Sequence, residues 1–104
     1  MESTMTKVSI VALGTVRDRL GWDVSVREVE VADAHATVGD VLQAVPTEHG
    51  GTLYEFLTEA GNLSAEYTVR VNGGCVRRKA GLDTGVHDGD TLLAMDIVRF
   101  IAGG

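Results

Sequence analysis

The order of its periodic segments constrains the fold of this chain most strongly. Residues 7–13 and 23–31 are rich in Val and Ile and predict two strands near the start of the chain. Residues 67–71, 75–76 and 91–100 have the same character near its end, and a single helical block lies between the two groups. This order predicts an α+β fold with a mixed sheet and its helices packed on one face.

The first two strands are expected to form a hairpin. Their connection, residues 15–22, is polar and has room for one helical turn. The alternation changes phase between Val26 and Val29, and a regular strand does not change faces. We therefore expect a β-bulge or bend near Arg27 and Glu28.

Two N-terminal capping patterns define the helical block. Thr37 is followed three residues later by Asp40, and Thr52 by Glu55. Apolar residues then recur at helical spacing in both segments. The first helix is predicted to end at about residue 45, before the only proline, and the second at about residue 60, before Gly61.

Turn signals complete the topology. Asn72-Gly73 is a strong two-residue hairpin signal, and residues 88–90 predict another tight turn. The first and last strands could then lie side by side at the centre of the sheet, with the end of the chain projecting from the last strand. That topology is the β-grasp fold of ubiquitin.

Charge and composition exclude several classes of function. The net charge of −6 argues against nucleic-acid binding, which depends on Lys and Arg neutralising phosphates. It favours a partner with a basic face, although simple solubility explains it equally well. No apolar run approaches the length of a membrane helix, the N-terminus lacks a signal-peptide pattern, and the single Cys75 cannot form an internal disulfide. We expect a cytoplasmic protein.

The sequence ends in two glycines, Gly103 and Gly104. Because glycine has no Cβ atom, such a segment can enter a narrow active site and deliver a terminal carboxylate. A frayed terminus is the alternative for this dipeptide taken by itself.

Several motifs in the same order resemble the ubiquitin-like sulfur carriers, the MoaD/ThiS type, which include the small subunit of molybdopterin synthase. The segment that contains Arg17, Leu20 and Gly21 is most similar to the molybdopterin branch. The approach to the glycines lacks the proline that is usual in the family, and the segment after residue 88 is a few residues longer. The matching stretches are residues 7–10, 16–21, 36–42, 69–73, 88–92 and 102–104.

The resemblance implies a carrier and not an enzyme. A ubiquitin-activating-like partner enzyme would use ATP to adenylate the Gly104 carboxylate. A sulfur source would then convert Gly104 to a thiocarboxylate that donates sulfur to a synthase subunit. The pathway that the resemblance favours is molybdopterin or tungstopterin synthesis. Two alternatives stay open: a protein modifier joined to lysines through Gly104, and a β-grasp interaction module with an inert tail.

The resemblance also assigns the residues of the site. Ala102, Gly103 and Gly104 would enter the partner's active site. From their position just before the tail, Val98, Arg99, Phe100 and Ile101 are expected to form the partner interface, with either Phe100 or Ile101 as an exposed anchor and part of the set packed in the core. Arg99 could pair with an acidic groove or be solvated. The implied boundaries are a loose N-terminus at 1–6, a β-grasp domain at 7–101 and a functional tail at 102–104.

The remaining reactive side chains form no catalytic or metal-binding set in the sequence. His35, His49 and His87 lack metal-ligand spacing, so we expect no bound metal or other cofactor. Cys75 is expected to be a half-buried strand residue, because a reactive thiol would need a lowered pKa. The basic cluster Arg77-Arg78-Lys79 is expected to be a solvated turn.

Overall fold

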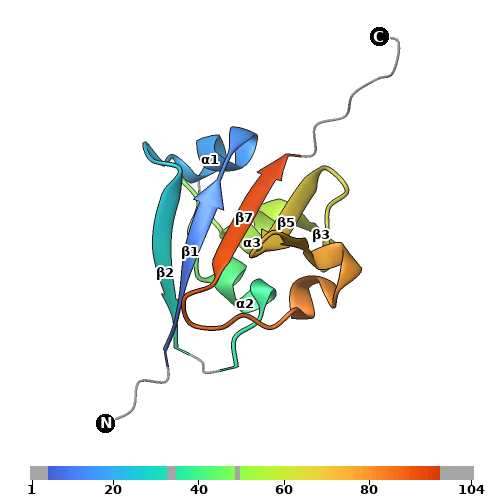
Figure 1. The fold of residues 1–104 in the computed structure, drawn as a ribbon. Coiled ribbons are helices and arrows are strands. Elements are labelled where there is room, and N and C mark those ends of the chain that lie inside the picture. Colours follow the sequence, from blue (N-terminus) through green and yellow to red (C-terminus); the bar gives the residue numbers. More distant parts are fainter. Residues whose placement is uncertain (1–4, 33–34, 49, 97–104) are drawn as a thin grey trace.

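A five-stranded mixed sheet forms the centre of the molecule (Figure 1). The computed structural model describes residues 5–32, 35–48 and 50–96. The strand order is β2-β1-β7-β5-β6, and the central strands β1 (Thr6–Ala12) and β7 (Thr91–Asp96) are parallel. β2 (Val26–Val31) pairs antiparallel with β1, and β5 (Tyr67–Val71) pairs antiparallel with β7 and β6 (Gly74–Cys75). This arrangement confirms the predicted α+β, β-grasp fold.

The helices begin where the capping patterns predicted. α2 (Val38–Gln43) has a complete capping box between Thr37 and Asp40, and α3 (Leu53–Leu57) has one between Thr52 and Glu55. Both helices pack behind the sheet (Figure 1). Their buried side chains meet alternate residues of the central strands, so one core lies between the sheet and the helical layer. The largest fully buried side chains are Ile10, Leu42, Leu53, Leu57 and Leu92.

The connection between β1 and β2 contains a complete helix. The sequence predicted room for a single turn, whereas α1 spans Gly14–Leu20 and buries Val16 and Leu20. Gly21 ends α1 in a left-handed conformation with φ of 70°. β1 and β2 are therefore antiparallel neighbours, as predicted, with a helix in their connection.

The predicted bulge in the second strand is absent. β1 and β2 pair without interruption from Thr6↔Val31 to Val11↔Val26. Val29 pairs with buried Val8, whereas Val26 pairs with Val11 on the outer face of the sheet. The phase change in the sequence therefore reflects an edge strand with valines on both faces, and Val26 is 52% exposed.

The second helix ends earlier than predicted. α3 stops at Leu57, and residues 58–63 form a small hairpin of β3 (Thr58–Glu59) and β4 (Asn62–Leu63). Ala60 and Gly61 have φ of 52° and 81°, so they form the hairpin turn. The helical spacing of Ala60 misled the prediction, because both residues of this turn need a left-handed backbone.

The end of the chain between Val71 and β7 follows the predicted turns with small differences. The prediction of a strand at Cys75 and Val76 was shifted by one residue, because β6 covers Gly74–Cys75. Two short 3₁₀ segments follow, at Val76–Arg78 and Gly81–Asp83. β7 is described to Asp96, and the part of the predicted strand from 97 to 100 lies outside the described residues.

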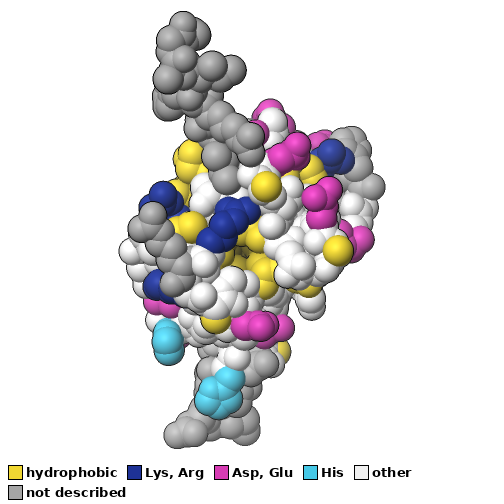
Figure 2. Space-filling model, turned by 90° about the vertical axis from the view of Figure 1, so that its right-hand side faces the viewer, with side chains coloured by type: hydrophobic (Ala, Val, Ile, Leu, Met, Phe, Trp, Pro, Cys, Tyr) yellow, Lys and Arg dark blue, Asp and Glu magenta, His cyan; other side chains and the backbone are white. Residues whose placement is uncertain are grey.

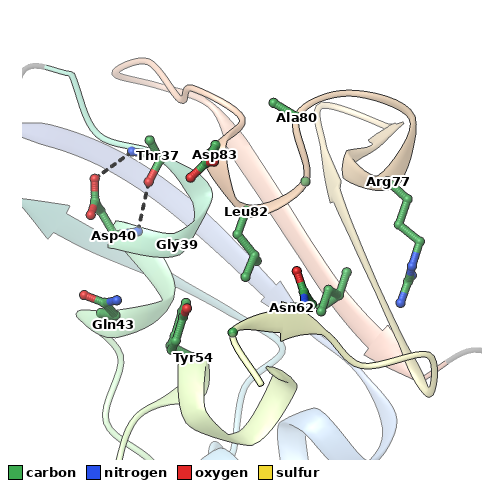
Figure 3. Close-up of a pocket in the computed structure, with 13 residues that line it drawn as sticks. Thr37, Gly39, Asp40, Gln43, Tyr54, Asn62, Arg77, Ala80, Leu82 and Asp83 are labelled. Atoms are coloured by element: carbon green, nitrogen blue, oxygen red, sulfur yellow. Dashed lines mark hydrogen bonds between the residues drawn. The ribbon is translucent and has the colours of Figure 1, made fainter. Parts of the chain in front are cut away.

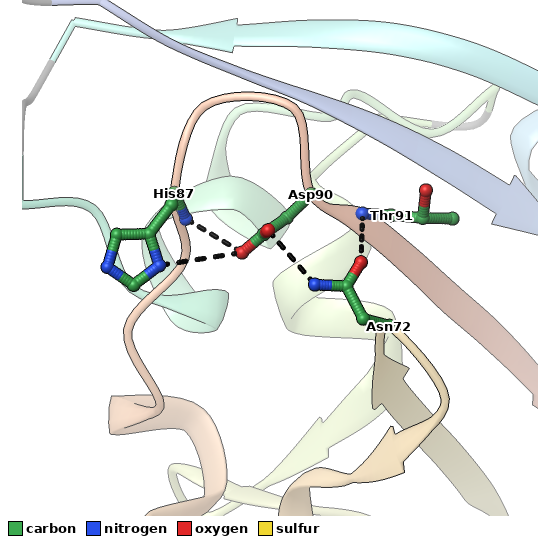
Figure 4. Close-up of polar contacts among 4 residues, drawn as sticks. All are labelled: Asn72, His87, Asp90 and Thr91. Atoms are coloured by element: carbon green, nitrogen blue, oxygen red, sulfur yellow. Dashed lines mark hydrogen bonds and ion pairs between the residues drawn. The ribbon is translucent and has the colours of Figure 1, made fainter.

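A polar network fixes the start of β7 against the β5–β6 turn (Figure 4). Asn72 accepts a hydrogen bond from the Thr91 amide at 2.9 Å and donates one to Asp90 Oδ1 at 3.0 Å. The His87 amide donates to Asp90 Oδ2 at 2.8 Å. The predicted Asn72-Gly73 and 88–90 turns are thereby joined into one unit.

Candidate functional site

The C-terminal end of β7 is the candidate site, because the predicted functional tail follows it. The structure describes β7 up to Asp96, and eight residues, 97–104, complete the sequence. All the predicted site residues, which are Val98, Arg99, Phe100, Ile101, Ala102, Gly103 and Gly104, lie outside the described residues. The structure therefore defines the surfaces around the base of that segment.

Asp96 is held on both sides. On one side it pairs with Tyr67 of β5 in the last rung of the antiparallel ladder. On the other side β1 has already ended, and the carboxylate of Asp96 contacts Thr15 of α1. The Thr15 hydroxyl lies 2.7 Å from both carboxylate oxygens of Asp96, and the Thr15 amide donates to Oδ1 at 3.1 Å.

A shallow groove adjoins this end of β7. We call it the exit groove; its volume is about 530 Å³ and its lining residues are Thr15, Asp18, Arg19, Phe56 and Tyr67. The Phe56 and Tyr67 ring centroids lie 5.1 Å apart, and the Arg19 guanidinium lies 4.6 Å from the Phe56 centroid. The groove thus offers aromatic surface with charged groups at its edge, a mixture that suits protein contacts.

The sheet face opposite the helices changes character along its length. Near the start of β1 it carries charged residues, including the ion pair between Lys7 and Glu30 at 3.8 Å. Near the C-terminal ends of β1 and β7 it carries apolar side chains that are partly or largely exposed. We call these residues the outer apolar patch: Val11, Val26, Leu93 and Met95. The apolar part of the face therefore lies at the end of the sheet from which residues 97–104 continue.

A basic group of side chains borders this face at β5 and β6. Figure 2 shows Lys and Arg side chains beside exposed hydrophobic ones on this side of the molecule. A cavity of about 430 Å³ is lined by Arg70, Cys75, Lys79 and two glycines. Arg77 donates to the carbonyl oxygens of Tyr67 and Ser64, so it ties this region to β5 as well as carrying charge. Arg77 therefore does more than occupy the expected solvated turn, because its side chain also holds that turn to β5.

Cys75 lies in β6 and is half-buried, as predicted. The backbone amide of Arg77 lowers the pKa of its thiol most strongly. Burial raises that pKa, and the Thr68 hydroxyl at 3.9 Å and the charges of Arg70 and Arg77 lower it further. The net pKa lies below the ordinary value of 9.0, so Cys75 has more thiolate character than an unperturbed cysteine.

A second, more polar pocket lies beside α2, away from the end of β7 (Figure 3). Its volume is about 430 Å³, and Thr37, Asp40, Tyr54, Arg77 and Leu82 are among its lining residues. Thr37 and Asp40 bond to each other's backbone amides in the cap of α2. Thr37 and Asp40 are thus already engaged in capping α2.

The described residues contain no group of three His, Cys, Asp or Glu side chains that could hold a metal ion. His35 and His87 are exposed, and His49 lies outside the described residues. No helix in the described part of the chain is long and apolar enough to cross a membrane.

Sequence reasoning missed Thr15 and Asp96. Thr15 was placed in a polar connection, and Asp96 was one residue of a long strand. The only local sign that α1 needs a distant capping group is Leu13 at its N-cap, because a leucine side chain cannot accept a hydrogen bond. The partner that replaces this cap lies 81 positions further along the chain.

Residues 12–104 match the ThiS family. No functionally curated protein shows significant similarity to the chain. The match begins at the last residue of β1 and covers every later helix and strand and the C-terminal glycines. It confirms the resemblance to ubiquitin-like sulfur carriers that the sequence motifs indicated. Carriers of this family are non-catalytic and bind no cofactor, in agreement with the expectation of a carrier and not an enzyme.

Similar solved structures have the same fold. The solution structure of the Haloferax volcanii HVO 2177 protein is 26% identical, with a TM-score of 0.77, and covers 95% of this chain and 90% of that one. CysO from Amycolatopsis orientalis, solved in a complex with BexX, is 26% identical with a TM-score of 0.73 over 90% of this chain and 99% of that one. The H. volcanii small archaeal modifier protein 1 is 23% identical with a TM-score of 0.65, over 89% and 99%. These likenesses support the fold, and the family match shows that the chain is a ThiS-type sulfur carrier-like protein.

Proposed function

Because this chain belongs to the ThiS family, we propose that it is a sulfur carrier that works through Gly104. A partner enzyme transfers AMP from ATP to the Gly104 carboxylate and releases pyrophosphate. Hydrosulfide attacks the acyl carbon, AMP leaves, and Gly104 becomes a thiocarboxylate. The carrier then gives its sulfur to an acceptor bound by a second enzyme, and water supplies the oxygen atom that restores the Gly104 carboxylate.

One observation supports this proposal above the others. β7 is the central strand of a family-type β-grasp domain, and the eight residues that follow Asp96 end in Gly103 and Gly104. Fully extended, such a segment spans about 26–29 Å, which is enough to reach a buried active site. The domain presents the C-terminal segment to the partner enzymes, and the partner enzymes catalyse the reactions.

We assign the parts of the chain accordingly. Residues 7–101 form the domain together with Thr6, the first residue of β1, which corrects the predicted boundary by one residue. Ala102, Gly103 and Gly104 enter the partner's active site. Val98, Arg99, Phe100 and Ile101 contact the partner, and the outer apolar patch extends this interface. An adenylating enzyme and a sulfur-accepting synthase subunit are the two partners.

We further propose molybdopterin or tungstopterin synthesis as the pathway. The segment around Arg17, Leu20 and Gly21 is similar to the small subunit of molybdopterin synthase. In the structure this segment is α1 and its left-handed C-terminal glycine, with the Arg17 guanidinium donating to the Trp22 and Asp23 carbonyl oxygens.

The test is intact-protein mass spectrometry of the chain isolated from its own host. We expect a species heavier than the free acid by the difference between one sulfur and one oxygen atom. Deletion of Gly104 should abolish it. Gly85→Ala is the control, because a Cβ atom at Gly85 meets nothing within 4 Å and the variant should keep the thiocarboxylate.

The same measurement separates the alternatives. Only the free acid, even after incubation with the host's adenylating enzyme, ATP and sulfide, would contradict the carrier proposal. Conjugates joined to lysines through Gly104 would indicate a protein modifier instead. Full biological function without residues 103–104 would indicate an interaction module.

A further inference from the structure

The contact between Thr15 and Asp96 provides a partner both for the start of α1 and for the edge of β7. α1 begins after Leu13, whose side chain makes no capping hydrogen bond, so the first amides of the helix lack a local acceptor. β7 extends past the last β1 rung, Ala12↔Ala94, so its edge on that side lacks a strand partner. The Asp96 carboxylate caps α1 and replaces the missing strand contact by accepting from the Thr15 amide and from the Thr15 hydroxyl, whose single hydrogen is shared between the two carboxylate oxygens.

The residue before Thr15 is adapted to this contact. Gly14 has φ of 61°, a left-handed conformation that other residues rarely adopt. A Cβ atom at Gly14 would lie only 3.0 Å from Asp96 Oδ1. Glycine therefore allows the carboxylate to approach the first turn of α1 closely.

We propose that Thr15 and Asp96 form a latch that positions the C-terminal segment for the partner enzyme. Asp96 is the last described residue before the segment that carries Gly104, so the latch fixes the point and direction from which that segment starts. This inference rests on the proposed function. Neither residue reacts; both act by holding the end of β7.

The latch orders the end of β7 before the carrier meets the partner enzyme, so the entropy cost of that ordering does not add to the barrier of the reaction. Without the latch, Met95 and Asp96 lose support on the α1 side, and their backbone must be ordered each time Gly104 reaches the reacting position. Docking of the domain itself is unchanged. The fraction of docked carriers with the carboxylate correctly placed falls, so kcat for adenylation falls while KM for the carrier stays nearly constant.

Variants on both sides of the latch test this inference. Thr15→Val keeps the shape of the side chain and removes the hydroxyl hydrogen bond, and Asp96→Ala removes both the hydroxyl and the amide hydrogen bonds. We expect kcat for adenylation to fall about threefold in Thr15→Val and up to about tenfold in Asp96→Ala. Thr15→Ser keeps the hydroxyl and should restore the rate of the wild type.

The matched control is Thr37→Val. It also replaces a capping hydroxyl by a methyl group, at α2 instead of α1. It should lower the melting temperature about as much as Thr15→Val does, and leave kcat unchanged. Amide hydrogen exchange of Met95 and Asp96 in the free carrier should be faster in the latch variants and not in Thr37→Val.

The double variant separates a latch from two independent contacts with the partner. If Thr15 and Asp96 act together, Thr15→Val combined with Asp96→Ala is no slower than Asp96→Ala alone. Additive losses would overturn the latch, as would wild-type kcat in both single variants. Either result leaves the sulfur-carrier function intact if the wild type is adenylated. A wild type that is not adenylated would instead contradict the proposed function, and the latch inference with it.

Discussion

The tertiary structure changes the chemistry of the Cys75 thiol. Its pKa is lowered first by the Arg77 amide and then by the Thr68 hydroxyl and the charges of Arg70 and Arg77, against the opposing effect of burial. The sequence predicted a half-buried strand residue, which is correct. The Arg77 backbone amide, with smaller contributions from Thr68 and the nearby basic side chains, gives this half-buried position more thiolate character.

Iodoacetamide labelling measures this effect. We expect the alkylation rate of Cys75 to rise with pH around a midpoint below 9.0, and Arg70→Ala to move that midpoint upward because it removes a nearby positive charge. Arg27→Ala removes the same charge at the opposite edge of the sheet and should leave the midpoint in place. Equal midpoints in the wild type and in Arg70→Ala would contradict the role of Arg70.

At the scale of elements, the β3–β4 hairpin contains a strained backbone position, Ala60, that a substitution can relieve. Ala60 has φ of 52°, a conformation in which a residue with a Cβ atom is disfavoured by roughly 1–2 kcal/mol. The other hairpin, between β5 and β6, has asparagine in the equivalent position, Asn72, with φ of 50°. Asparagine tolerates this conformation better than alanine does.

Ala60→Asn should therefore increase the free energy of unfolding, by up to about 1 kcal/mol, as measured by urea denaturation. Ala80→Asn is the matched control: Ala80 is also exposed, but its φ is −96°, so the change should be within about 0.5 kcal/mol. An unchanged or lower stability in Ala60→Asn would show that the turn is not strained at Ala60.

At the scale of the whole molecule, Asp90 links the folding of distant segments to pH (Figure 4). Its side chain is only 17% exposed. Burial raises the pKa of its carboxyl. The hydrogen bonds from Asn72 and His87 and the charge of His87 together lower it by more than burial raises it, so the net pKa lies below 3.8. A carboxyl with a lowered pKa in the folded state stabilises the fold above its unfolded value, near 3.8, and loses that contribution as pH falls through the folded value.

We therefore expect the melting temperature to fall as pH falls below about 4, partly through Asp90. Asp90→Asn should lower the melting temperature at pH 7 and reduce its dependence on pH in the acid range. Asp18→Asn removes the same charge from an exposed position on α1 and should leave the acid dependence unchanged. Identical acid profiles for the wild type and Asp90→Asn would exclude this role.

The sequence predicted those elements whose signals are local. Both capping patterns and the Asn72-Gly73 turn were correct, because each depends on residues a few positions apart. The same local reasoning failed at Ala60, where helical spacing concealed a turn, and at Val26, where an exposed edge valine was interpreted as a bulge.

By itself, therefore, the sequence determined the α+β class, the helix starts, the turns and the C-terminal glycines that suggest the function. The tertiary structure alone decided what adjoins the base of the C-terminal segment. Thr15 and Asp96 are 81 positions apart, and the outer apolar patch combines residues from three strands. Such contacts exist only after β1 and β7 pair in parallel, and no short-range pattern specifies them, because backbone preferences and local caps such as those of α2 and α3 act only over a few residues.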